Sequence, residues 1–406
     1  MRNPVLTIFY QYNPWHSTIG GIQTFISTFI KYAPTDFEIR LVGTGYDPDL
    51  AIGQWHPGTF EGRELQFMPL FWLPEDNVRK LIPTSVKYTL TLMGKNLASD
   101  FMHFYRIEPT LATRHWSGEK TLFIQNDIHK QVLAKEGDNA ILWRRFPAAY
   151  FALERQLVGQ FDQIYSCNSD SAELYRRRYP NMAERVRFLN NTVDQDRFFP
   201  GQETERQQLR RALAQQLGLP EETQFILFAG RLHPQKDPLR LVGAIAALNH
   251  PQAHLLMAGE GELAERIRQE IQRLNLSQHI TLLGAVNPPR LAELHRLSQA
   301  FVLTSAYEGL PFAALEALAS GTPVVTTPAG ETPRLLTPDS GIVCVDRTPQ
   351  TIAQALRHVL QHPDQYPVAA CVQVAQPFGA QQVIHGVYAD MRDRWQAQAH
   401  RSSAEG

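Results

Sequence analysis

The segment AGRLHPQKDP carries two cationic side chains, Arg231 and Lys236, shortly after the apolar stretch QFILF. Asp237 and Pro238 follow them, and these residue types are common at the cap and in the first turn of a helix. We therefore expect the two cations to lie on a loop between a strand and a helix. A planar guanidinium and a compact ammonium on such a loop suit a diphosphate. Two solvated charges on a surface loop are the alternative that this spacing leaves open.

Two carboxylates, Glu308 and Glu316, stand in a second segment, SAYEGLPFAALEALASGTPVV. Pro311 and Gly321 are residue types that begin and end a helix, so Glu308 should precede the helix and Glu316 should lie in its second turn. The backbone N–H groups at the start of a helix attract anions. Because the neighbours of Glu316 are apolar almost all round, we expect its carboxylate to have a function. A nucleoside diphosphate sugar requires both kinds of group. Its diphosphate needs an anion site, and its hydroxyl groups need carboxylates that accept hydrogen bonds.

Short apolar runs alternate with longer amphipathic stretches along the sequence, which predicts an α/β protein with parallel sheets covered by helices on both faces. At 406 residues the chain fits two domains of ordinary size. The polar stretch around 190–220 predicts an N-terminal domain over residues 1–195 and a C-terminal domain over 196–377. The amphipathic segment 378–397 is expected to return to the first domain. Ligands of such sheets bind on the loops that follow the strands, where both motifs lie.

The composition is that of a soluble globular protein, with 43% hydrophobic and 19% charged residues and a formal net charge of −1. No basic excess is present to attract nucleic acid. Three widely separated cysteines have no metal-type spacing and favour a reducing, cytoplasmic setting. No stretch is apolar enough to span a membrane. The aromatic and basic stretch 67–95 leaves peripheral contact with the inner face of a membrane open.

The two motifs in this order resemble those of the retaining family-4 (group 1) glycosyltransferases of GT-B fold: Gly-Arg-Leu followed by a lysine, then Glu-Gly followed by Glu-Ala and Gly-x-Pro-Val-Val. The resemblance covers nearly the whole chain, because NNTVDQDRFFP matches the segment that enters the interdomain linker. It implies two Rossmann-like, doubly wound domains and a hexosyltransferase that uses a UDP- or GDP-sugar. The acceptor would be a glycan or a lipid-linked sugar of cell-envelope polysaccharide or glycolipid biosynthesis. No cofactor and no metal ion are implied.

The resemblance also assigns roles to the residues that match the donor-binding motifs. Arg231 and Lys236 would hold the diphosphate, and Glu316 would bind the ribose hydroxyl groups. Gly20 and Gly21, which follow the first predicted strand, match a glycine pair that lets the backbone approach the diphosphate.

A further set of residues is expected at the reacting centre. Glu308 would contact the transferred sugar, with the backbone of Gly309 and Leu310 beside it. The family often has Asp-x-x-His-x-His in its first domain, whereas this chain reads DFMHFYRIEP. His103 is retained and Tyr105 replaces the second histidine, so we predict that Tyr105 acts as a hydrogen-bond donor, with His103 able to share or replace that role. A core position for Tyr105 is the alternative.

Some features of the sequence point to other chemistry. Gly259 and Gly261 fit a dinucleotide-binding fingerprint, but the next predicted strand ends without the acidic residue that binds ribose, which disfavours a nicotinamide cofactor. Asp-x-Asp pairs at 47–49 and 194–196 have the form that metal-dependent transferases use, yet they lie in a proline turn and in the linker. A non-catalytic nucleotide-sugar-binding partner subunit and a nucleotide-sugar epimerase remain alternative functions.

Overall fold

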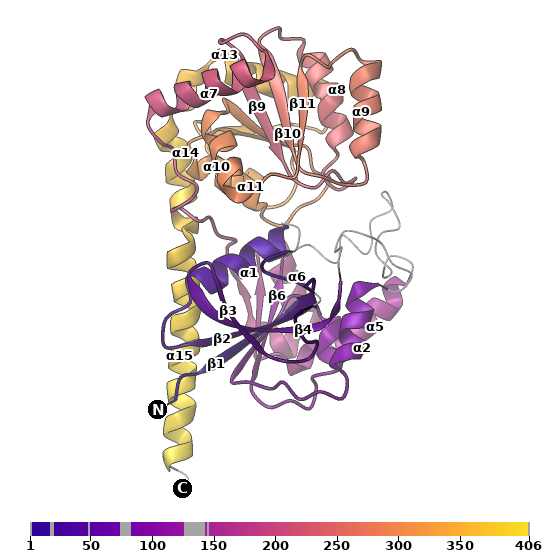
Figure 1. Ribbon diagram of the computed structural model, residues 1–406, viewed down its shortest axis with the longest axis vertical. Helices are drawn as coiled ribbons and strands as arrows, with labels where there is room; N and C mark the ends of the chain where they lie inside the picture. Colours follow the sequence, from indigo (N-terminus) through magenta and orange to yellow (C-terminus); the bar gives the residue numbers. More distant parts are fainter. Residues whose placement is uncertain are drawn as a thin grey trace. The chain divides into compact units, whose positions relative to one another are not determined.

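The computed structural model describes residues 2–16, 20–47, 49–73, 83–125, 143 and 146–404, with side chains as far as residue 398. The chain divides into two compact units (Figure 1). The first takes the N-terminal part of the chain to Asn190 and resumes at Ala380, and the second runs from Asn191 to Gly379. The sequence places these two boundaries at 195/196 and 377/378.

The first unit is built on an eight-stranded sheet in the order β3-β4-β2-β1-β5-β6-β7-β8. Its strands are β1 (Val5–Phe9), β2 (Glu38–Gly45), β3 (His56–Phe60), β4 (Arg63–Trp72), β5 (Phe101–Phe104), β6 (Glu119–Ile124), β7 (Gln163–Ser166) and β8 (Val186–Phe188). Neighbouring strands pair in parallel except at the edge, where β3 and β4 are antiparallel. Glu61 and Gly62 join this pair with φ values of 48° and 75°. A connection of two residues is too short for a parallel crossover, so this hairpin corrects the expectation of parallel pairing throughout.

Helices cover both faces of the first sheet. They are α1 (Gly21–Lys31), α2 (Thr84–Leu92), α5 (Pro147–Leu157), α6 (Ser169–Arg178) and α15 (Ala380–Ala404), with short 3-10 turns η1 (Glu108–Leu111), η2 (Val158–Gln160) and η3 (Pro180–Arg185). The helices α2, α5 and α6 share one apolar core. On the other face, the rings of Phe29 in α1 and Tyr388 in α15 lie 4.7 Å apart. The C-terminal helix therefore belongs to the first unit (Figure 1).

The second unit contains a six-stranded parallel sheet in the order β11-β10-β9-β12-β13-β14. Its strands are β9 (Gln224–Ala229), β10 (Ala253–Ala258), β11 (Ile280–Gly284), β12 (Ala300–Leu303), β13 (Val324–Thr326) and β14 (Gly341–Val343). The strand order reverses between β9 and β12, which pair side by side although β10 and β11 separate them in sequence. The loops that follow β9 and β12 consequently leave the sheet at its switch point, the usual place for a ligand in this architecture.

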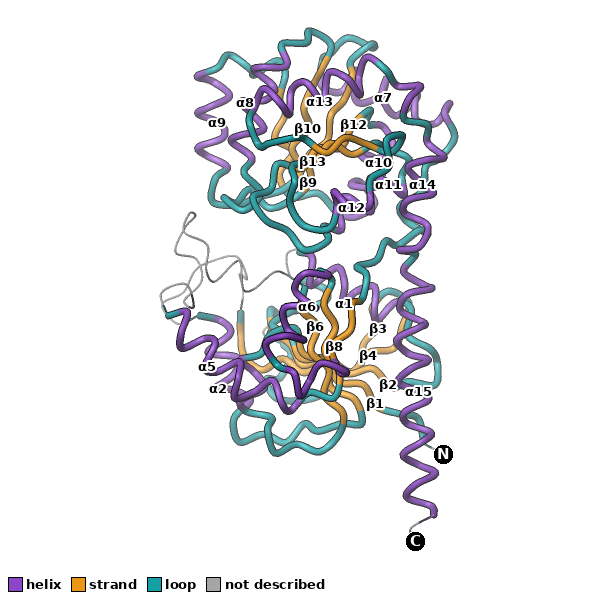
Figure 2. Tube along the Cα trace, turned by 180° about the vertical axis from the view of Figure 1, so that it is seen from behind, coloured by secondary structure: helices purple, strands orange, loops and turns teal. Residues whose placement is uncertain are grey.

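Two apolar cores lie on opposite faces of this second sheet. One packs α8 (Pro238–Leu248), α9 (Ala264–Arg273) and α13 (Pro349–Gln361) against the strands. The other packs α7 (Glu203–Leu217), α10 (Pro288–Leu297), α11 (Phe312–Ala319) and α14 (Val368–Ala375). Short elements α12 (Thr332–Leu335), η4 (Pro363–Gln365) and η5 (Gln376–Phe378) complete the unit. Figure 2 shows the strands between α8 and α9 on one side and α10 and α11 on the other.

Within the described part of the chain, every helix is too short or too polar to cross a membrane.

Candidate functional site

The loop after β9 carries the two cations that the sequence singles out. Arg231 is exposed, and its side chain makes no hydrogen bond or ion pair to the residues that the structure describes. Lys236 is partly buried, and its Nζ lies 2.5 Å from Oε1 of Glu308. The aliphatic stem of Lys236 passes close to Gly230, where a Cβ would lie 3.7 Å from Cε of the lysine. The structure therefore leaves Arg231 available to a ligand and joins Lys236 to a carboxylate from the second motif.

Hydrogen bonds hold the loops after β9 and β12 against each other. The backbone N–H of Ala306 donates to the carbonyl of Gln235 at 2.8 Å, and Nε2 of Gln235 donates to the carbonyl of Tyr307 at 3.1 Å. The hydroxyl of Thr304 donates to the carbonyl of Lys236 at 2.8 Å. These contacts explain how two motifs 72 residues apart come to share one site.

The loop after β12 places Glu308 in a largely buried position, with the residue 7% exposed. The carbonyl of Gly309 accepts from the N–H of Glu331 at 2.9 Å, and that of Leu310 accepts from Nδ2 of Asn191 at 2.6 Å. Their own N–H groups donate to none of the residues that the structure describes. Gly309 and Leu310 thus have their acceptors bonded and their donors available, as contact with a sugar or phosphate oxygen requires.

Close backbone approach at Gly330 makes this arrangement possible. Gly330 has φ 72°, and a Cβ there would lie 2.4 Å from the carbonyl oxygen of Gly309. Sequence reasoning missed Gly330, and it noted Asn191 only as part of the segment NNTVDQDRFFP, without a role at the site. The turn-forming run TPAGETP after a predicted strand is the signal that could have indicated Gly330.

Helix α11 places Glu316 in its second turn, as the sequence predicts, with Pro311 at the N-cap position. Glu316 is 7% exposed, and its carboxylate makes no hydrogen bond to the described residues. The fully buried His295 of α10 lies beside it, with Nε2 of the imidazole 3.7 Å from Oε2 of Glu316. Sequence reasoning did not identify His295. A buried carboxylate without hydrogen-bond partners has an unused capacity to accept from ligand hydroxyl groups.

An anion at this site can contact two cations and the N-terminal end of α11. Hydroxyl groups of the same ligand can donate hydrogen bonds to two carboxylates. The side chains of Lys236 and Glu308 are largely buried, and charge interactions are stronger there than in water. The macrodipole of α11 adds partial positive charge near its first turn. This combination can bind a diphosphate next to hydroxylated rings, and it can stabilise negative charge on a departing diphosphate.

Gly20 and Gly21 follow β1 in the chain, and the strand order of the first sheet reverses between β1 and β5. Gly20 is the N-cap residue of α1, with φ −150° and ψ 168°, and Gly21 is the first residue of the helix. A Cβ at Gly20 would lie 2.8 Å from Oε1 of Gln23. The structure thus puts the pair at the start of a helix that follows a strand, the position suited to an anion.

His103 and Tyr105, the two residues expected at the reacting centre, lie in the aromatic core of the first unit. His103 in β5 is 0% exposed, and its ring packs 5.1 Å from Phe29 and 4.8 Å from Phe123. Burial, with a smaller contribution from the charge of Arg394, lowers the pKa of His103 to about 3. Tyr105 is 5% exposed and stacks on Phe123, and burial raises the pKa of its hydroxyl. This environment favours the core role that the sequence left open for Tyr105 and disfavours proton transfer by either side chain.

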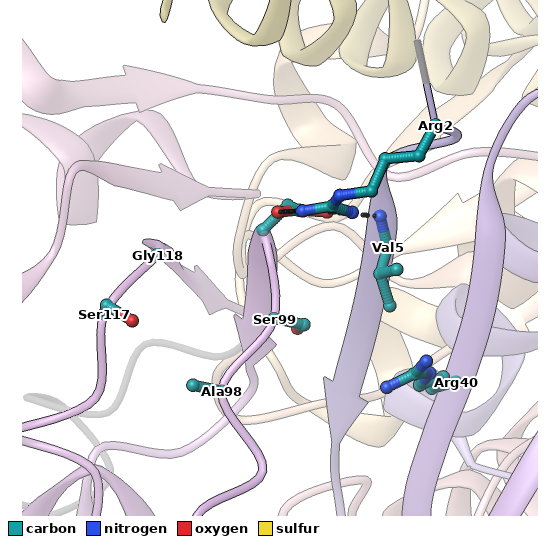
Figure 3. Close-up of a pocket in the computed structure, with 8 residues that line it drawn as sticks. Arg2, Val5, Arg40, Ala98, Ser99, Ser117 and Gly118 are labelled. Carbon is teal, nitrogen blue, oxygen red and sulfur yellow. Dashed lines mark hydrogen bonds and ion pairs between the residues drawn. The ribbon is translucent and has the colours of Figure 1, made fainter. Parts of the chain in front are cut away.

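Asp100 directly precedes β5, the strand that contains His103. Asp100 receives two hydrogen bonds from Arg2, both 2.6 Å long, and one of 2.8 Å from the N–H of Val5. Figure 3 shows Arg2 and Val5 at the edge of a cavity of about 280 Å³. This cavity lies at the amino ends of β1 and β5, opposite the edge at which ligands of parallel sheets bind. Arg2 pairs with Asp100 and Arg40 pairs with Glu38, so both arginines that line this cavity already have a carboxylate partner.

The glycines of the dinucleotide-like fingerprint, Gly259 and Gly261, have a packing role beside the loop after β9. Gly259 has φ 138°, and a Cβ there would lie 2.0 Å from the carbonyl oxygen of Gly230. A Cβ at Gly261 would lie 2.4 Å from the carbonyl oxygen of Leu232. The two glycines allow the loop after β10 to touch the loop that carries Arg231, which accounts for their presence without a nicotinamide.

Neither Asp-x-Asp pair forms part of a metal site among the described residues. Asp47 accepts a hydrogen bond of 2.9 Å from the N–H of Asp49, which is a local turn. Asp194 is largely buried in the linker, where its carbonyl accepts from the N–H of Arg197 at 3.0 Å. Nowhere in the described ranges do three or more His, Cys, Asp or Glu side chains gather in a way that could hold a metal ion.

Residues 210–370 match the family described as glycosyl transferases group 1. The D-inositol 3-phosphate glycosyltransferase of Geodermatophilus obscurus is 30% identical over 263 residues, which are 62% of this chain and 56% of the relative. The chain spans about half the length of the curated relatives that it matches.

Solved structures resemble the chain over almost its full length. Sucrose-phosphate synthase from Thermosynechococcus elongatus superposes with a TM-score of 0.77 at 19% identity, covering 98% of this chain and all 100% of that one. The Anabaena protein HepE in complex with UDP-glucose has a TM-score of 0.71 at 16% identity, with 96% and 100% covered. These likenesses establish the fold, which is that of GT-B glycosyltransferases.

Proposed function

We propose that the protein transfers a hexose from a UDP- or GDP-sugar, because residues 210–370 match the group 1 glycosyltransferases and the chain has the GT-B fold. Arg231 and Lys236 bind the diphosphate, Glu316 binds the ribose, and Glu308 binds the transferred sugar. Transfer proceeds with retention, and catalysis rests on positioning and on stabilising the departing diphosphate.

The observation that carries the proposal is the convergence of the loops after β9 and β12 at the switch point of the second sheet. This convergence brings Arg231, which is available to a ligand, and the Lys236–Glu308 ion pair, 2.5 Å from Nζ to Oε1, to the start of α11. The carboxylate of Glu316 follows one turn further along the helix. Single motifs of this kind occur on surface loops of many proteins. Their joint placement at a ligand-binding edge favours a nucleoside diphosphate sugar over two solvated charges.

We propose a glycan or lipid-linked acceptor and a role in cell-envelope polysaccharide or glycolipid biosynthesis, on the cytoplasmic side of the membrane. One of the similar structures is that of WaaG, a glycosyltransferase involved in lipopolysaccharide biosynthesis. In the first unit, Leu90 and Met93 at the end of α2 are 56% and 45% exposed, and Lys87 is exposed one turn earlier. Exposed apolar side chains beside a cation favour peripheral contact with an anionic membrane.

Metal-independent transfer is part of the proposal, because cations of the chain and helix N–H groups would neutralise the diphosphate. Activity is therefore expected to survive EDTA. Complete loss with EDTA that manganese or magnesium restores would contradict this part of the mechanism.

A thermal-shift panel of nucleotide sugars tests the proposed function directly. A donor present at a hundred times its Kd should stabilise the protein by about 2.7 kcal/mol, while unrelated nucleotides such as NAD should not. Release of nucleoside diphosphate from the stabilising donor then separates an enzyme from a non-catalytic partner subunit, which would bind without turnover. Absence of stabilisation by every UDP- and GDP-sugar would refute the assignment.

A further inference from the structure

Asp237, the residue after the donor-site lysine, has an unusual backbone conformation. It occupies the N-cap position of α8 with φ 49° and ψ 52°, in the left-handed region that residues other than glycine seldom adopt. An aspartate at an N-cap ordinarily lies in the extended region and accepts a hydrogen bond from the first turn of its helix. Asp237 does neither, since its side chain makes no capping hydrogen bond. Its backbone N–H donates to the carbonyls of His233 and Pro234 at 3.3 and 3.2 Å, and its carboxylate contacts other residues.

Two arginines bind the carboxylate instead. Nε of Arg240 and Nη2 of Arg347 donate to the same oxygen, Oδ2 of Asp237, at 2.6 and 2.7 Å. Arg240 also donates through Nη1 to the carbonyl of Arg347 at 2.7 Å, which closes the group into a ring of contacts. Arg240 lies in α8 itself, whereas Arg347 follows β14, 110 residues after Asp237. The edge of the sheet is thus tied to the loop that carries the donor-site cations.

The left-handed residue fixes how the chain leaves Lys236. The hydroxyl of Thr304 donates to the carbonyls of both Lys236 and Asp237, at 2.8 and 3.1 Å, which is possible only when the two carbonyls point the same way. If Asp237 returned to the extended region, its carbonyl would rotate away and the peptide after Lys236 would turn with it. The direction in which Lys236 approaches Glu308 consequently depends on the conformation of Asp237.

We infer that Arg347 is a positioning residue for the donor site: with Arg240, it holds Asp237 in the left-handed conformation and thereby aims Lys236 at the diphosphate. The inference rests on the proposed function of Lys236. The three side chains are 22–34% exposed, so each ion pair alone contributes little. Together they favour the left-handed conformation of Asp237 over the extended one. A modest free-energy difference is enough to shift this equilibrium.

Glycine provides the decisive test, because it adopts a left-handed conformation without a side chain to hold it. UDP and GDP affinity would be measured by calorimetry for the full chain and for Asp237→Ala, Asp237→Gly, Arg347→Ala and the double variant Asp237→Gly/Arg347→Ala. Asp237→Ala and Arg347→Ala should each weaken binding on the order of tenfold. Asp237→Gly should remain within about threefold of the parent, and adding Arg347→Ala to it should cause no further loss.

An exposed arginine of the same unit serves as the matched control. Arg268→Ala removes a guanidinium that pairs with Glu265 on α9, and it should leave nucleotide affinity unchanged. Loss of affinity from Arg347→Ala that persists in the Asp237→Gly background would overturn the inference, because Arg347 would then act on the nucleotide itself. Parental affinity in Asp237→Ala would also overturn it. Failure of the parent to bind UDP or GDP would instead remove the proposed function and, with it, the role of Lys236.

Discussion

Replacing Lys236 by methionine deletes the ammonium group while retaining most of the aliphatic stem that lies over Gly230. Two consequences of this change can be separated. The diphosphate loses a charge-assisted contact, and Glu308 loses its partner at 2.5 Å. The first consequence affects ligand affinity, and the second affects the stability of the protein without ligand.

Both magnitudes follow from the geometry. A hydrogen bond to a charged group contributes about 1.5–3 kcal/mol, so UDP or GDP affinity should fall about ten- to a hundredfold. The Glu308 side chain is 6% exposed and that of Lys236 20%, so removing the lysine leaves a nearly buried carboxylate without its partner. We expect the free energy of unfolding to fall by about 1–3 kcal/mol, below the cost for a fully buried pair because water reaches the lysine.

A double variant separates the two effects. Lys236→Met/Glu308→Gln removes the unpaired charge, so it should recover most of the lost free energy of unfolding in urea while its nucleotide affinity stays low. Glu308→Gln alone leaves the ammonium available to phosphate, so its nucleotide affinity should equal or exceed that of the parent, and its turnover should fall. Calorimetry with UDP and GDP and urea unfolding measure the two quantities on the same samples. Parental affinity in the double variant would refute the diphosphate role of Lys236.

Three other substitutions probe the remaining candidates. Glu316→Gln should weaken every nucleoside diphosphate and every donor about tenfold, because the ribose contact is common to all of them, and selective loss of a single donor in the calorimeter would contradict this role. His103 has its pKa lowered from 6.5 to about 3, so the unfolded chain takes up a proton that the folded protein does not, and stability falls as the pH drops below 6.5. His103→Leu should abolish this contribution, about 1 kcal/mol between about pH 7 and about pH 5.5 in urea unfolding, whereas an unchanged pH dependence would show that the imidazole is hydrated. Tyr105→Phe removes a buried hydroxyl that has no hydrogen-bond partner among the described residues, so the free energy of unfolding should change by less than about 1 kcal/mol. A tenfold fall in its turnover at saturating donor would show that the hydroxyl takes part in transfer.

The sequence predicts the α/β class, the paired parallel sheets and the placement of each motif relative to a strand and a helix. Glu316 lies in the second turn of a helix as expected, because Pro311 and the apolar residues around it specify that helix locally. The antiparallel β3–β4 hairpin was not predicted, although the two-residue turn at Glu61 and Gly62 decides it. Alternating apolar runs indicate strands without indicating the direction in which an edge strand pairs.

Periodicity, turn residues and helix caps act over a few positions, so the sequence by itself determined which segments form strands and helices and which loops carry cations and carboxylates. Only the tertiary structure decided that Lys236 pairs with Glu308, that His295 lies behind Glu316, and that Arg347 holds Asp237. These contacts depend on β9 lying beside β12 and on the loop after β14 reaching the loop after β9. Partners 72 and 110 residues apart leave no local pattern, because the sheet order that brings them together is set by the packing of two whole cores.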